Sequence, residues 1–137
     1  MKQVRYYIKD ILEMLCVKLS EAKVGACTYA EHRPIGIGEQ KDSISVVSLP
    51  AEIQNQGAYQ NTEVRFDLIV RNREGGISAT DELQEMLDNL LGLFPIVKER
   101  YSITSPRLLF KGDDGNGFTV WVVQAHMVIN TTDRLWQ

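Results

Sequence analysis

The segment Thr62–Leu91, TEVRFDLIVRNREGGISATDELQEMLDNLL, carries the clearest structural pattern in the chain. In its first part, apolar residues occupy every second position, which is typical of a strand with one buried face and one wet face. The buried face is expected to hold Val64, Phe66, Leu68 and Val70. The wet face is expected to hold Glu63, Arg65, Asp67 and Arg71, with Ile69 as an apolar exception.

The second part of the same segment changes to helical periodicity. Its apolar residues are Leu83, Met86, Leu87, Leu90 and Leu91, while Asp81, Glu82, Glu85 and Asp88 fall elsewhere on the helical wheel. Ser78 or Thr80 is expected to cap the start, and Gly92 followed by Pro95 is expected to end the helix. Gly75 and Gly76 provide the backbone freedom for the reversal. The segment therefore predicts a strand, a turn and an amphipathic helix whose acidic face is solvated.

The remaining elements follow from the same periodicities. Lys2 to about Ala22 is expected to be a helix with one apolar stripe, and two short strands are expected at 26–31 and Ser43–Leu49. A hairpin follows from Ser102, with turn residues at 112–117 and a long strand from Phe118 to Asn130. This order predicts an α+β fold, with a mainly antiparallel β-sheet and two principal helices packed on one face. Residues 1–137 are expected to form one domain.

Two features of the pattern point to contacts with other molecules. The strand from Phe118 is apolar on both faces for half its length, and a neighbouring subunit could supply the cover that this needs. Trp136 is a second candidate contact, because tryptophan is enriched at interface anchors. The polar stretch between Pro50 and Thr62 is either a functional loop or an ordinary surface loop.

The sequence predicts no catalytic, cofactor-binding or metal-binding residues. His32 and His126 lie in different elements without metal-ligand spacing, and Cys16 and Cys27 fit neither a disulfide framework nor a zinc site. The acidic, glycine-rich stretch at 113–117 is explained by hairpin turn chemistry. We therefore expect a protein that is not an enzyme and has no cofactor, with an assembly or binding role.

The composition excludes further classes. A net charge of −3 and a pI near 5.4 argue against a module that binds nucleic acid by neutralising phosphates, so no sequence-specific nucleic-acid partner is expected. No stretch has the length of a membrane span, and Asp10 interrupts the start before a signal core could form. The expectation is a cytoplasmic protein without a membrane partner.

The chain resembles the minor capsid and tail terminator proteins of long-tailed bacteriophages, also called tail completion or head-tail joining proteins. The resemblance rests on the N-terminal helix, on VRFDLIVRN followed by SATDELQEMLDNLLG, and on the hairpin SPRLLFKGDDGNGFTVWVVQAHMVI. Ser105-Pro106, 113–117 and Val120-Trp121 match the family's proline-containing entry, acidic turn and aromatic-flanked strand in kind. The similarity spans roughly Lys2 to Ile129.

The resemblance implies a structural protein that forms a ring, commonly a hexamer, on the completed tail tube of a phage or prophage. Its partners would be copies of itself, the tail tube protein and the head-tail connector proteins. Its place would be the tail or neck of the virion, after assembly in the bacterial host cytoplasm. Two alternatives remain: a neck or connector adaptor, and a small-molecule-binding or hydrolytic α+β domain with a pocket between helices and sheet.

Candidate interface residues come from the polar stretch, the wet face of the central strand, the hairpin tip and the tail. They are Gln54, Gln56, Tyr59, Arg65, Asp67, Arg71, Asp113, Asp114 and Trp136.

Overall fold

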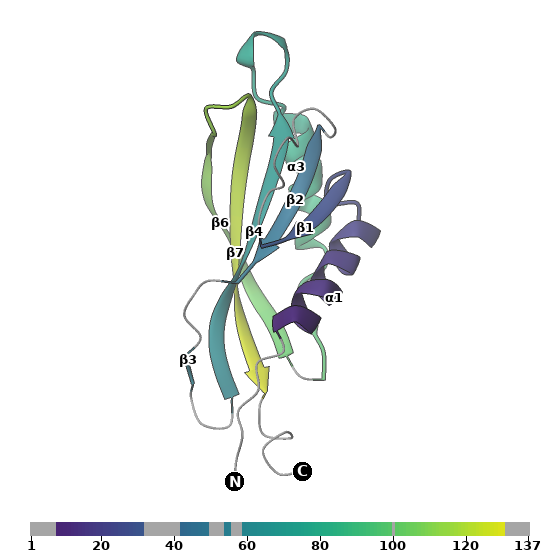
Figure 1. Ribbon diagram of the computed structural model, residues 1–137, viewed down its shortest axis with the longest axis vertical. Helices are drawn as coiled ribbons and strands as arrows, with labels where there is room; N and C mark the ends of the chain where they lie inside the picture. Colours follow the sequence, from purple (N-terminus) through teal and green to yellow (C-terminus); the bar gives the residue numbers. More distant parts are fainter. Residues whose placement is uncertain (1–7, 32–41, 50–53, 56–58, 100, 131–137) are drawn as a thin grey trace.

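The computed structural model describes residues 8–31, 42–49, 54–55, 59–99 and 101–130 (Figure 1). Helices α1 (Ile8–Glu21) and α3 (Thr80–Leu91) and a short 3-10 turn, η1 (Glu74–Gly76), accompany the strands. The strands are β1 (Cys27–Ala30), β2 (Ser43–Ser48), β3 (Gln54–Asn55), β4 (Tyr59–Arg71), β5 (Ile96–Val97), β6 (Tyr101–Asp113) and β7 (Phe118–Asn130).

The strands form one sheet in the order β1-β2-β4-β7-β6-β5, and β3 pairs with the first residues of β4. Only the β1–β2 pair is parallel among these strands, and the others are antiparallel. Figure 1 shows that the sheet is long and strongly twisted, with the β6–β7 hairpin along one side. The predicted α+β class with a mainly antiparallel sheet is confirmed.

The alternation along β4 has the predicted effect on its apolar side. Val64, Phe66, Leu68 and Val70 are all buried in one cluster, which also contains the buried side chains of α1 and α3. The register places Leu68 beside Trp121 of β7, so the neighbouring strand extends the same apolar surface. Phe94 adds an edge-on ring contact to Phe66, with ring centroids 5.9 Å apart.

The expected wet face of β4 is partly buried, so this prediction was wrong at Ile69. Ile69 pairs with Ile44 and packs in a second cluster with Val46 and Phe118. The apolar residues of β2 and β7 lie beside Ile69, and together they remove it from water. Phe118 is therefore already buried within the chain and needs no neighbouring subunit to cover it.

Two predicted boundaries also differ from the structure. The polar stretch contains β3 and the start of β4, where Gln54 pairs with Asn61 through the backbone ladder, which does not depend on apolar alternation. At α3 the N-cap is Ala79 without a side-chain hydrogen bond, so neither Ser78 nor Thr80 caps it. The predicted end is right: the Gly92 N–H donates to the Asp88 carbonyl oxygen at 3.0 Å.

Candidate functional site

The charged residues predicted on β4 are engaged within the chain. Arg65 Nε donates to Asp67 Oδ1 at 2.7 Å, and Arg71 Nε donates to Asp42 Oδ1 at 2.9 Å. The Arg71 guanidinium also lies 5.1 Å from the centroid of the Phe118 ring. These pairs are solvent-exposed, and such pairs contribute about 0.2–1 kcal/mol each. Arg65 and Arg71 thus both have partners within the chain, without a contact to another subunit.

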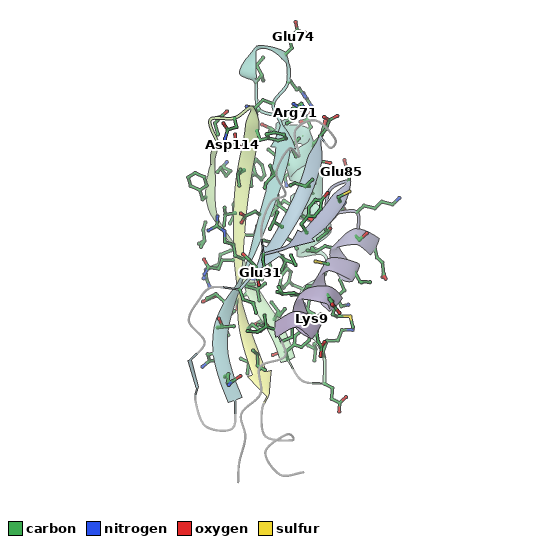
Figure 2. The ribbon with its side chains drawn as sticks, in the orientation of Figure 1. Lys9, Glu31, Arg71, Glu74, Glu85 and Asp114 are labelled. Atoms are coloured by element: carbon green, nitrogen blue, oxygen red, sulfur yellow. The ribbon has the colours of Figure 1, made fainter. Side chains whose placement is uncertain are left out.

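The acidic residues of the hairpin tip hold the β6–β7 turn. Asp113 Oδ1 accepts from the Gly115 N–H at 2.6 Å, and Asp114 Oδ1 accepts from the N–H groups of Asn116 and Phe118 at 2.7 and 3.1 Å. Figure 2 shows Asp114 at one end of the molecule, near the loop that carries Glu74. The turn chemistry predicted from the sequence is therefore present, and contact with a partner at this tip stays a prediction.

The remaining predicted interface residues lie elsewhere. Gln54 and Tyr59 belong to β3 and to the start of β4, at the end of the sheet opposite to the hairpin tip (Figure 1). Because β4 has 13 residues, Tyr59 at its start lies roughly 40 Å from the hairpin tip, at the usual rise per residue of a strand. Gln56 and Trp136 lie outside the described residues. The structure thus does not bring the nine predicted residues together in one site.

The sequence did not predict an exposed apolar surface on β6. We define the β6 ridge as Arg107–Lys111, in which Leu108, Leu109 and Phe110 are 41%, 52% and 55% exposed. The sequence shows this apolar run, and its pattern is that of a buried strand. The strand has register shifts between Thr104 and Arg107 and between Leu108 and Phe110, so Leu108 and Phe110 lie opposite Val123 and Val122, on the two faces of the sheet edge. A β-bulge interrupts the alternation of side chains along a strand. The periodicity of the sequence therefore does not predict that Leu108, Leu109 and Phe110 are exposed.

The β6 ridge lies on an edge of the sheet. In the part of the chain that the structure describes, β5 pairs only with Ser102 and Ile103, so no strand lies beside the ridge. Ser105 has a positive φ of 57°, and Pro106 has no backbone N–H to donate. Proline and bulges are the usual means by which an exposed edge is protected from unwanted strand pairing.

The exposed face of α3 is acidic, in contrast to the apolar β6 ridge. Asp81, Glu82, Glu85 and Asp88 are all exposed, and the helix has no lysine or arginine. Arg73 approaches Asp81 at 3.8 Å, and Gln84 Nε2 donates to Asp88 Oδ1 at 2.8 Å. We refer to Asp81, Glu82, Glu85, Asp88 and the exposed Leu91 as the α3 acidic face.

No protein-family model matches the chain, and no curated protein matches it.

Three features of the described residues bear on enzyme chemistry. They include no group of three or more His, Cys, Asp or Glu side chains that could hold a metal ion. A hollow of about 160 Å³ lies between Lys23, Gly25, Ser43 and the start of α3, and it is smaller than the usual 300–1,000 Å³ of ligand pockets. Burial and, secondarily, Glu13 raise the pKa of Cys16, which disfavours a reactive thiolate.

Neither of the described helices is long and apolar enough to cross a membrane.

Proposed function

We propose that the chain is a structural protein of a tailed bacteriophage or prophage, a ring-forming tail terminator or minor capsid protein that caps the tail tube and joins it to the head connector. The observation that carries the proposal is the β6 ridge, where three consecutive large apolar residues are exposed on a sheet edge. Such a surface is characteristic of a protein that binds other protein subunits.

The arrangement of the sheet supports assembly into a ring. A ring needs two different surfaces on each subunit, because its contacts are heterologous and close on themselves. The β6 edge supplies one such surface. In our proposal, both helices cover one face of the sheet and leave its edges for neighbouring subunits.

The two alternatives differ in what supports them. A neck or connector adaptor would use the same exposed edge, so only the identity of the bound partner separates it from a terminator. A small-molecule-binding or hydrolytic domain needs a pocket with convergent polar groups, and the hollow beside Lys23 and Glu82 is small and open. The exposed β6 ridge supports the structural role, and this hollow gives no support to the pocket-bearing alternative.

The test is tube capping. Purified chain is added to the tail tube protein encoded in the same phage genome while that protein polymerises, and tube lengths are measured by electron microscopy. A terminator shortens the tubes in proportion to its concentration and is seen at one tube end. Unchanged tube lengths with no bound chain would overturn the terminator role, and binding to connector proteins alone would assign the adaptor role.

A further inference from the structure

The β6 ridge combines apolar side chains with positive charge. Leu108, Leu109 and Phe110 stand between Arg107 and Lys111, which are both exposed. Arg107 lies 3.8 Å from Glu63, and the Lys111 ammonium lies 5.2 Å from the centroid of the Trp121 ring. By the register with β7, Arg107 and Phe110 lie on the sheet face that carries Glu63, whereas Leu108 and Lys111 lie on the opposite face with Trp121. The edge thus presents a cation and an apolar side chain on each of its two sides. The ridge therefore suits a partner surface that is acidic and partly apolar.

The α3 acidic face has that chemistry. On a helix of 3.6 residues per turn, Asp81, Asp88 and Leu91 fall within one stripe, and Glu85 lies beside it. Ile77, just before the helix, is exposed as well. The stripe thus offers carboxylates for Arg107 and Lys111 together with an apolar contact at Leu91.

The two surfaces cannot meet within one chain. In the sheet order, β7 separates β6 from β4, and α3 packs with the cluster around β4. Figure 1 shows β6 along one side and α3 beyond β4 toward β2. A contact between the two surfaces must therefore join two molecules, and because it is heterologous it can repeat around a ring.

We propose that the β6 ridge of one copy packs against the α3 acidic face of the next copy. This inference rests on the proposed ring function and names its subunit contact. Charge complementarity selects the occupant. Pairing of β6 with a second β6 would bring each cation beside a ridge that contains no carboxylate. Pro106 and the two register shifts also interrupt the hydrogen-bond ladder that such pairing requires.

The experiment exchanges the charges of the two surfaces. A ridge variant carries Arg107→Glu and Lys111→Glu, a helix variant carries Glu85→Lys and Asp88→Lys, and a third chain carries all four changes. Glu85 and Asp88 lie beyond the first helical turn, so their replacement leaves the carboxylates near the positive end of the helix dipole in place. Mass is measured by light scattering across a concentration series.

The expected result is loss and recovery of assembly. The native chain forms a closed oligomer, and each two-site variant needs at least about ten-fold higher concentration to assemble, which corresponds to about 1.4 kcal/mol. The four-site chain recovers native assembly, as does an equimolar mixture of the two variants, since every contact is again between opposite charges. A native chain that stays monomeric, variants that assemble normally, or the absence of recovery would each overturn the contact.

Two controls separate this contact from general effects. Lys9→Glu with Lys98→Glu changes the net charge by the same amount as the ridge variant, at exposed positions outside both surfaces, and Figure 2 shows Lys9 on α1, far from Asp114. For the apolar part, Leu109→Ser should weaken assembly, whereas Val17→Ser, at a residue that is also 52% exposed, should not. Thermal unfolding verifies that each variant is folded.

The outcome is independent of the tube-capping test. A chain that caps tubes but fails the charge exchange keeps the terminator role and loses this contact. A chain that passes the charge exchange but ignores the tube keeps the contact and loses the terminator role.

Discussion

Two buried polar side chains, Gln60 and Tyr101, lie in one row of the sheet, and within the described part of the chain they have no hydrogen-bond partners. Gln60 is fully buried and pairs across the ladder with Ile129, which in turn lies opposite Tyr101. Among the residues that the structure describes, neither the side-chain amide of Gln60 nor the hydroxyl of Tyr101 has a hydrogen-bond partner. An unpaired buried polar group costs about 1–3 kcal/mol, so this row lowers the stability of the fold.

Replacement of Gln60 should make the protein more stable. Gln60→Met keeps the approximate length of the side chain and removes the unpaired amide, so the free energy of unfolding should rise by about 1–3 kcal/mol in urea titrations. Gln84→Met, at an exposed glutamine, is the matched control and should change stability by less than about 0.5 kcal/mol. A less stable Gln60 variant would show that the amide has a partner in solution.

Tyr101 should give the stability of the protein an alkaline pH dependence. Burial raises the pKa of Tyr101, so the folded state favours the neutral phenol. The contribution of the neutral Tyr101 phenol to stability is fully present below the pKa of about 10 that tyrosine has in the unfolded state. This contribution is lost as pH rises through the higher pKa of the folded state. The free energy of unfolding should therefore fall above about pH 10, and less steeply in Tyr101→Phe. Identical slopes for both chains, measured by urea unfolding, would contradict this.

At the scale of elements, the β6–β7 hairpin depends on its tip. Asp114 accepts two backbone hydrogen bonds there, and Gly115 and Gly117 have positive φ angles of 80° and 94° that glycine adopts without strain. The turn thus fixes the register between two strands of 13 residues each.

Loss of the Asp114 carboxylate should destabilise the hairpin. Asp114→Ala removes the oxygen that accepts both hydrogen bonds and should lower the free energy of unfolding by about 1–2 kcal/mol. Asp114→Asn keeps one carbonyl oxygen as an acceptor and should recover most of that loss. Hydrogen exchange at the Asn116 and Phe118 amides gives a local measurement, since protection should fall in the alanine variant alone.

The elements differ in how far the sequence predicts them. The alternation at Val64–Val70 and the helical spacing at Leu83–Leu90 are local and strong, so the core-facing residues of β4 and α3 were predicted correctly. The burial of Ile69 depends on Ile44, which is 25 positions away in the chain, and local periodicity does not contain that pairing. The candidate site was harder to predict, because Leu109 is exposed at a bulge and the pairing of Arg71 with Asp42, 29 positions away, results from tertiary placement. Arg65 pairs with Asp67, only two residues along the same strand.

At the scale of the whole molecule, β4 and β7 connect the two apolar clusters. Phe66 belongs to the larger cluster and Ile69, three residues later on β4, to the smaller one. Phe118 of β7 packs with Ile69, while Val123 of the same strand packs with Phe66 in the larger cluster. Because the same two strands support both clusters, neither cluster can unfold alone without breaking the ladder of the other.

Substitutions in either cluster should therefore destabilise the whole domain. Phe66→Ala should cost about 3–5 kcal/mol and Ile69→Ala about 2–5 kcal/mol. In both variants, tryptophan fluorescence and far-UV circular dichroism should report one coincident unfolding transition. A separate early transition in Ile69→Ala would show that the smaller cluster is an independent unit.

The strand order also bears on the synthesis of the chain by the ribosome. β7 lies between β4 and β6 in the sheet, yet it is made after both of them. Until Phe118–Asn130 has left the exit tunnel, nascent β4 has an open apolar edge and β6 lacks its main partner. Folding must wait for this strand, and a nascent chain that stops before Phe118 presents the surfaces that chaperones bind.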